Sequence, residues 1–405
     1  MRERNYWILT VSELTSQAGN LFRLVTVTTF TFMLTNSILA TALQYLFTSL
    51  PGFIFSGYAG KISDRVRPKV GMVLISILSA GGTLLYLVSR NAWLIYSLNI
   101  FMATAGLMGS SMRAVWLPRI VSRSEIAKRN GIRSALGGFI DLLFPTIGGL
   151  AIAALGVRVG FFFDSASFLL AAGGFLLTSD GVKSQVTVDN TGSVAPETID
   201  DPQRDASPDD SVYISGWQFF KSRHNLLIYL LAYVVLGATG QALSAVFLPF
   251  LDYQFGVGAA AFGIVISLYL VGNILSGAAI ARWHDRITPK GALLLLLITP
   301  FDWIGMLYSP DVVVLLFFVL INGCIMTGAI SLLMSICQSE APESIVGRVF
   351  ATAMTFHFGA EAVGTIGGGL IAMTFGFAAN FWIMSTMSFV LLTLICCRAY
   401  VRRAA

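Results

Sequence analysis

The chain has 405 residues, of which 56% are hydrophobic and 12% are charged, and its mean hydropathy is +0.76. A water-soluble domain carries roughly 25% charged residues, so this composition excludes a soluble globular protein. The net charge of +5 is compatible with a nucleic-acid partner, but the basic residues gather at one end of alternate apolar runs, as membrane orientation requires. We therefore expect no nucleic acid and a lipid bilayer instead.

Twelve apolar runs predict twelve membrane-spanning helices. Strands of membrane barrels alternate apolar and polar residues, whereas these runs stay apolar for about 20 residues, the length that a helix needs to cross a bilayer. The predicted spans are 7–34, 38–60, 70–89, 92–113, 131–154, 157–180, 226–250, 258–282, 291–308, 311–337, 348–373 and 376–397. The predicted fold class is therefore an all-α membrane protein.

Residues 181–215 differ in kind, because they are poor in apolar residues and rich in Asp, Ser, Thr and Pro. Such a segment cannot bury enough apolar surface to fold, which predicts a disordered acidic linker. It separates an N-terminal six-helix bundle, 1–180, from a C-terminal six-helix bundle, 216–405. The next segment, Trp217 to Arg223, mixes aromatic and basic residues and is expected to lie along the membrane interface.

The positions of Lys and Arg predict the orientation. If the N-terminus is cytoplasmic, most of these residues fall in the two termini and the connections on the same side. The opposite side has Arg90 and Arg158 near its short loops. Both termini and the linker are therefore expected in the cytoplasm.

Two short motifs occur once in each half. Asp64-Arg65-Val66-Arg67-Pro68-Lys69 returns as Asp285-Arg286-Ile287-Thr288-Pro289-Lys290, and Thr146-Ile147-Gly148-Gly149 returns as Thr365-Ile366-Gly367-Gly368 at almost the same offset. Two repeats in register predict two similar halves related by an axis normal to the membrane, which is a transporter architecture.

Gly57, Asp64, Arg65 and the basic residues that follow resemble the loop between the second and third helices of the major facilitator superfamily. Leu117-Pro118-Arg119-Ile120-Val121 and Phe163-Asp164-Ser165-Ala166-Ser167-Phe168 make the chain similar to its drug and siderophore exporters, the type of macrolide efflux pumps and the enterobactin exporter. The resemblance implies the major facilitator fold, two pseudo-symmetric six-helix bundles, in the plasma (inner) membrane of a bacterium.

The repeated loop predicts a cytoplasmic gate, because glycines let helices approach and an Asp can accept hydrogen bonds at a helix start. We expect Asp64 to face Arg348, and Asp285 to face Arg129 or Arg133; basic anchoring of the loops is the alternative. The gate residues are Gly57, Gly60, Asp64, Arg65, Asp285, Arg286 and Arg348.

Pro145-Thr146-Ile147-Gly148-Gly149 resembles the fifth-helix signature of proton-coupled antiporters in this superfamily, with Phe144 in place of its first glycine. Proline frees a backbone carbonyl and glycines thin the helix. Pro145, Gly148 and Gly149 therefore predict a helix bend or close packing on a partner helix.

Ionisable residues within the spans are the candidates for proton coupling. Burial in apolar surroundings suits a carboxyl group to exchange protons near neutral pH, and an intramembrane charge normally faces a cavity or a partner. Static hydrogen bonds between helices are the alternative for each acid, and a satisfied core residue is the alternative for the histidine. The candidates are Glu13, Asp141, Glu361 and, four residues before it, His357.

Polar and aromatic residues of four spans predict the substrate cavity. Gln17 and Asn20 share a face with Glu13 on the first span, and Arg23 borders it, either reaching outward to the interface or pairing with an acid or an anionic substrate. The resemblance implies that the fourth, seventh and tenth spans also line the pathway. Their candidates are Asn99, Thr104, Tyr229, Tyr233, Gln241, Asn322 and Met326, which suit a bulky, partly apolar substrate.

The sequence has no nucleotide-binding loop, no clustered metal ligands and no nucleophile elbow, so we expect no enzyme, cofactor or metal. The leading hypothesis is a monomeric secondary exporter of a small amphipathic molecule, such as a drug, antibiotic or siderophore, in exchange for protons. An uncoupled facilitator or a lysophospholipid translocator is the alternative with the same fold. A non-transporting membrane sensor is the alternative of another class.

Overall fold

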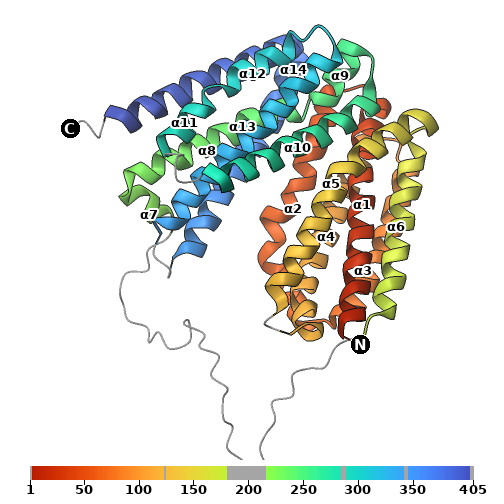
Figure 1. Ribbon diagram of the computed structural model, residues 1–405. Helices are drawn as coiled ribbons and strands as arrows, with labels where there is room; N and C mark the ends of the chain where they lie inside the picture. The colour runs from red at the N-terminus through yellow and green to blue at the C-terminus, as the bar shows by residue number, and fades with distance from the viewer. Residues whose placement is uncertain (1, 123–124, 180–215, 284–288, 342–344, 402–405) are drawn as a thin grey trace, which may run out of the picture.

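The computed structural model describes residues 2–122, 125–179, 216–283, 289–341 and 345–401, and every regular element within these ranges is a helix. The N-terminal half runs from the red helix to the yellow one in Figure 1. Its helices are α1 (Arg2–Thr35), α2 (Ile38–Arg65), α3 (Pro68–Leu85) with the short 3-10 helix η1 (Tyr86–Val88), α4 (Ala92–Ile120), α5 (Ile126–Leu155) and α6 (Arg158–Leu177).

The C-terminal half begins with the short helix α7 (Gly216–Ser222), whose Phe219 and Phe220 are buried against α8 and α14. Its other helices are α8 (His224–Ser244), α9 (Phe247–Phe255), α10 (Gly258–Trp283), α11 (Pro289–Leu296), α12 (Thr299–Leu307), α13 (Val312–Ser339) and α14 (Val346–Val401). α14 is interrupted at Gly376, whose φ of 84° is a backbone conformation that glycine adopts without strain. The two arms of α14 therefore correspond to two predicted spans.

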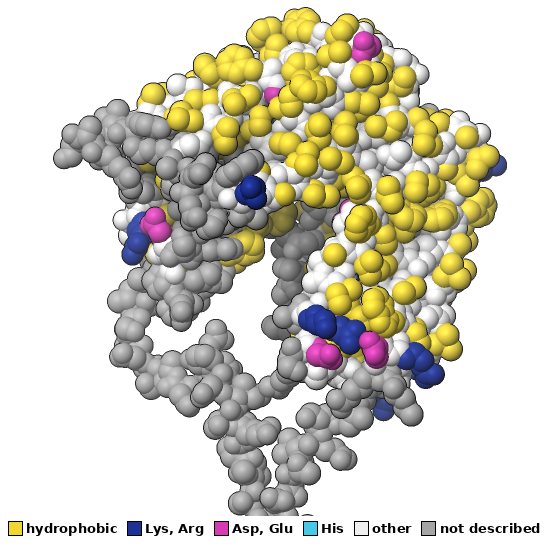
Figure 2. Space-filling view, viewed as in Figure 1, with side chains coloured by type: hydrophobic (Ala, Val, Ile, Leu, Met, Phe, Trp, Pro, Cys, Tyr) yellow, Lys and Arg dark blue, Asp and Glu magenta, His cyan; other side chains and the backbone are white. Residues whose placement is uncertain are grey.

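Each of the twelve predicted spans falls on one helix, on a pair of short helices or on one arm of α14. In the described part of the chain, seven helices are long and apolar enough to cross a membrane, and Leu293–Leu307 and Val312–Gly328 are shorter apolar stretches. Apolar side chains cover most of the visible outer face, whereas charged ones gather near its ends (Figure 2). Exposed Phe139, Leu170 and Leu177 fit a surface that faces lipid.

The two halves meet near the ends of the helices farthest from the N-terminus. A Cβ atom added at Gly149 of α5 would lie 3.2 Å from the Cα atom of Gly263 of α10, and the Thr146 hydroxyl is 2.8 Å from that of Ser267. A Cβ atom added at Gly369 of α14 would lie 2.9 Å from the Ala42 Cβ atom of α2. Both contacts join the N-terminal half to the C-terminal half through small residues.

On the side of the N-terminus the halves separate, and the space between them opens toward the bottom of the view in Figure 2. We call this side the open side and the other the closed side. α5 continues as one helix through Pro145, and the Pro145–Gly149 segment packs closely on α10. Close packing on a partner helix, one of the two expectations for this motif, is therefore what the structure contains.

Several predicted features fall outside the described residues. The linker 181–215 and the gate residues Asp285 and Arg286 belong to these. The backbones of Gly57, Gly60, Asp64 and Arg65 are in α2 and that of Arg348 is in α14, but their side chains are outside the description. The predicted gate contacts therefore stay predictions.

Candidate functional site

A central cavity of about 420 Å³ lies mainly against the C-terminal half. Its wall is largely apolar and aromatic, with Phe247, Phe262, Tyr269, Trp303 and Met306 among its residues. Leu24 of α1 and Tyr45 of α2 contribute from the N-terminal half. Of the residues predicted from sequence, the cavity brings together Gln241, Asn322, Met326, His357 and Glu361.

His357 and Glu361 lie one turn apart on α14 and face each other, with 3.2 Å between His357 Nε2 and Glu361 Oε1. His357 Nδ1 lies 3.2 Å from the backbone oxygen of Tyr233 in α8, and the Tyr233 ring stacks on the imidazole with 3.9 Å between ring centres. Gly237 of α8 leaves the space that the imidazole occupies, because an added Cβ atom would lie 2.5 Å from Nδ1. α8 thus fixes the histidine ring against the cavity wall.

Asp302 of α12 is a second acid near this cavity. The amide of Asn322, a cavity residue, donates a hydrogen bond of 2.8 Å to Asp302 Oδ2. Asp302 Oδ1 is buried without a hydrogen-bond partner in the described structure. Asp302 therefore holds Asn322 in position at the wall.

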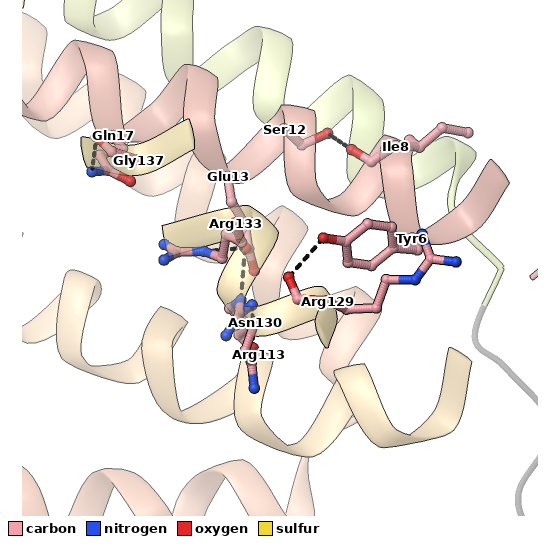
Figure 3. A network of polar contacts seen from close by, with 10 residues as sticks. All are labelled: Tyr6, Ile8, Ser12, Glu13, Gln17, Arg113, Arg129, Asn130, Arg133 and Gly137. Atoms are coloured by element: carbon pink, nitrogen blue, oxygen red, sulfur yellow. Dashed lines mark hydrogen bonds and ion pairs between the residues drawn. The ribbon is translucent and has the colours of Figure 1, made fainter. Parts of the chain in front are cut away.

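A second cavity of about 440 Å³ lies inside the N-terminal half, between α1, α3, α4, α5 and α6. Glu13, Gln17 and Asn20 share a face of α1 and all line it. Gln17 and Asn20 were expected in the same cavity as Gln241, Asn322 and Met326, which line the central cavity. Arg113 of α4 and Arg133 of α5 reach the Glu13 carboxylate, with Nε–Oε2 distances of 2.7 and 3.0 Å (Figure 3). We call this the N-half cavity.

Arg113 was not among the residues singled out from sequence. Arg133 was one of two expected partners of Asp285, which lies outside the described residues, so that contact stays a prediction. Arg113 also donates a hydrogen bond of 3.1 Å to Asn130. An arginine at the end of the fourth apolar run is the same signal that selected Glu13, namely a charge inside a membrane span. Arg129, the other expected partner of Asp285, lies over the Tyr6 ring and pairs with Glu3 and Glu125.

Asp141, a proton-coupling candidate, accepts a hydrogen bond from the Gln17 amide. It lines neither of these cavities nor a third, of about 410 Å³, on the closed side. The alternative that the sequence left open for Asp141, a static hydrogen bond between helices, describes the contact it makes.

Arg23 pairs with the fully buried Asp164 of α6, with Nε 3.0 Å from Oδ2, and its Nη2 atom donates to Asn20 Oδ1 at 2.8 Å. The Thr83 hydroxyl donates to the same Asp164 oxygen at 2.8 Å. Arg23 thus pairs with an acid inside the N-terminal half, and it lines none of the three cavities.

Asn99 and Thr104 were expected in the substrate cavity, and the structure places them elsewhere. Asn99 is buried, accepts a hydrogen bond of 2.7 Å from the Tyr86 hydroxyl and donates to the Gln44 backbone. Thr104 donates to the Ile100 backbone oxygen of its own helix. Helix packing turned Asn99 toward α2 and η1, which a single-span pattern cannot predict.

The two tyrosines expected in the cavity do not line it directly. Tyr233 contributes through the His357 ring that it stacks on, and Tyr229 packs at the edge of the buried apolar clusters of the C-terminal half.

Among the described residues, no group of His, Cys, Asp and Glu has the arrangement of a metal site.

Two helical bundles that meet at one end and border a cavity are the architecture of a membrane transporter. A family model described as the Major Facilitator Superfamily matches residues 19–365, with a second match over 238–404. The chain belongs to the major facilitator superfamily.

Solved structures share the fold. The nucleoside transporter NupG has a TM-score of 0.76 at 12% identity, covering 97% of this chain and 98% of that one. A bacterial homologue of the iron transporter ferroportin, in an inward-facing state, has a TM-score of 0.69 at 16% identity, covering 98% of both chains. An inward-facing bacterial homologue of the human lysosomal transporter Spinster has a TM-score of 0.69 at 13% identity, covering 99% of this chain and 97% of that one. No curated protein matched the chain in sequence.

Proposed function

We propose that this transporter moves a small amphipathic molecule by alternating access and that a proton held between His357 and Glu361 is coupled to the movement. Because the expected orientation puts the open side in the cytoplasm, the structure then corresponds to a cytoplasm-facing state. Outward movement in exchange for protons is the direction that the resemblance to drug and siderophore exporters favours. The observation that carries the proposal is the His357–Glu361 pair in the wall of the central cavity.

The contacts of the pair define what it does with a proton. A backbone carbonyl only accepts hydrogen bonds, so His357 Nδ1, facing the Tyr233 oxygen, carries a hydrogen. His357 Nε2 and the Glu361 carboxylate then share one further proton across 3.2 Å. The pair is neutral with this proton and carries one negative charge without it.

A change of one charge in a largely apolar cavity alters which ligand and which conformation are favoured. The halves are joined on the closed side at Gly149 and Gly263, so alternating access requires this contact to break. A proton that changes the relative stability of the two conformations is coupled to the substrate.

Transport by the purified protein in proteoliposomes tests the proposal. The probes are 8-anilinonaphthalene-1-sulfonate, an amphipathic anion, and rhodamine 6G, an amphipathic cation, each followed by fluorescence with a pH gradient imposed in either direction. We expect flux of at least one probe to depend on the gradient, and Glu361→Gln to abolish this dependence. Glu340→Gln is the matched control, since Glu340 is an exposed acid of the same half that pairs with Arg223 outside the cavity.

Gradient dependence that survives in Glu361→Gln contradicts this assignment of the proton site. Flux that ignores the gradient in the unmodified protein favours the uncoupled facilitator. If a fluorescent lysophospholipid is transported and neither probe is, the lipid translocator is favoured. If neither probe nor the lysophospholipid is transported, the non-transporting sensor is favoured.

A further inference from the structure

The charged residues that line the N-half cavity include more positive than negative charge. Arg113 and Arg133 both contact one oxygen of one acid, Glu13 Oε2. A single guanidinium group would neutralise that carboxylate, so the second leaves a local excess of one positive charge. An unbalanced charge within a membrane is costly and normally serves a ligand or a partner.

Polar atoms inside this cavity also lack partners. Glu13 is 8% exposed, and its Oε1 atom has no hydrogen-bond partner in the described structure. Arg133 contacts Glu13 through Nε, and within the described residues its remaining nitrogens have no acceptor. Figure 3 shows both arginines approaching Glu13 from α4 and α5, which leaves guanidinium donors beside a buried acceptor. An acid group flanked by a hydrogen-bond donor would satisfy both.

Among the described residues, the acids nearest to this cavity do not cancel the excess at its wall. Asp141 is eight residues beyond Arg133 on α5, about 12 Å along the helix axis, and is bonded to Gln17. Asp164 is already paired with Arg23. An anionic ligand is therefore the group that fits the two arginines.

The N-half cavity and the central cavity meet the same face of α1. Asn20 lines the first and Leu24 lines the second, four residues or about 6 Å apart along the axis. Phe247, Phe262 and Trp303 of the central cavity supply an apolar and aromatic wall. One molecule with a charged head and an apolar body can thus contact both cavities.

We propose that the transported molecule is an amphipathic anion, whose acid group binds Arg113 and Arg133 while its apolar body lies in the central cavity. That the anion is transported rests on the proposed function, but its binding to Arg113 and Arg133 is testable without transport. It predicts that the acid group, and not only the apolar body, determines affinity.

Two probes with one scaffold test this directly. 8-Anilinonaphthalene-1-sulfonate is N-phenyl-1-naphthylamine with an added sulfonate, so the pair differs by the anionic group. Saturable binding of each is measured by fluorescence on the full chain in nanodiscs. We expect Arg113→Gln and Arg133→Gln each to weaken binding of the sulfonate at least about tenfold and to leave binding of the neutral amine unchanged. Each single variant keeps one arginine for Glu13, so the fold should persist.

Arg133→Lys keeps the charge and is expected to retain most of the sulfonate affinity. Arg129→Gln is the control for removal of an arginine on α5, because Arg129 pairs with Glu3 and Glu125 and does not line the cavity. Equal losses for both probes, or no loss for either, would overturn the proposal. Loss of the sulfonate affinity in Arg129→Gln as large as in Arg133→Gln would do so too.

Separate arms identify the source of the anion. If inorganic phosphate or phosphatidylglycerol in the nanodisc occupies the arginines and excludes the sulfonate without being displaced by it, the acid belongs to an ion or a lipid and the proposal fails. Displacement of either by the sulfonate supports it. Gradient-dependent flux of rhodamine 6G without the sulfonate supports the proposed function and overturns this inference. Arginine-dependent binding of the sulfonate without flux keeps the anion site and overturns the transport role.

Discussion

Gly149 of α5 packs on Gly263 of α10 so closely that a Cβ atom at Gly149 would lie 3.2 Å from the Gly263 Cα atom. This contact joins the two halves on the closed side. Gly149 belongs to the motif Thr146-Ile147-Gly148-Gly149, which the sequence repeats in the second half. A transporter that alternates must break such a contact and form another on the opposite side.

We expect Gly149→Val to weaken the closed-side contact, because inserting methyl groups into a tight packing contact costs about 1–3 kcal/mol. The population should shift toward opening on the closed side, seen as a longer distance between spin labels on α5 and α10. Gly138→Val on the same helix is the control, since Gly138 has open space around its Cβ position. An unchanged distance distribution in Gly149→Val would show that this contact does not set the conformation.

Asp164→Asn should destabilise the N-terminal half by about 3 kcal/mol, because it leaves the Arg23 charge without its buried partner. Thermal unfolding in detergent measures this loss. The double variant Arg23→Met with Asp164→Leu is expected to recover most of it, since apolar residues can replace a buried pair. Asp252→Asn, at an exposed position of α9, should have little effect. If the double variant is less stable than Asp164→Asn, the pair has a further role.

Asp141 and Glu361 occupy similar places in the two halves, but their surroundings differ. Asp141→Asn should keep gradient-dependent transport and lose about 1 kcal/mol of stability, as expected for one hydrogen bond between helices. Glu361→Gln should lose the gradient dependence. The same proteoliposome assay compares them, and the reverse result would move the proton site into the N-terminal half.

Glu13→Gln should cost more stability than Arg133→Gln. The first leaves two arginines facing a neutral amide, whereas the second leaves a balanced pair of Glu13 and Arg113. We expect the difference to be about 2 kcal/mol or more in thermal unfolding, because an uncompensated buried charge is the expensive outcome. Similar losses for both variants would argue that the charge excess is neutralised by another group.

The sequence predicted the helices well because each depends on one contiguous apolar run. The predicted face of α1 was also informative, since Glu13, Gln17 and Asn20 follow from helical spacing and do line one cavity. Asn99 and Thr104 show the limit, because a polar residue in a span faces either a cavity or a neighbouring helix, and its spacing is the same in both cases.

The partners of the buried charges could not be predicted in the same way. Arg113 and Arg133 are 100 and 120 residues from Glu13 along the chain, and Asp164 lies on a different helix from Arg23. The repeated motif indicated that two halves exist, but the contact between Gly149 and Gly263 depends on how α5 crosses α10.

The amino-acid sequence by itself determined a bundle of membrane helices in two related halves, because a backbone in a bilayer must satisfy its hydrogen bonds within each apolar segment. Tertiary structure alone decided which acid meets which arginine, which histidine borders the central cavity and on which side the halves close. These outcomes depend on the packing angle and rotation of helices that are distant in sequence, and local composition carries no information about either.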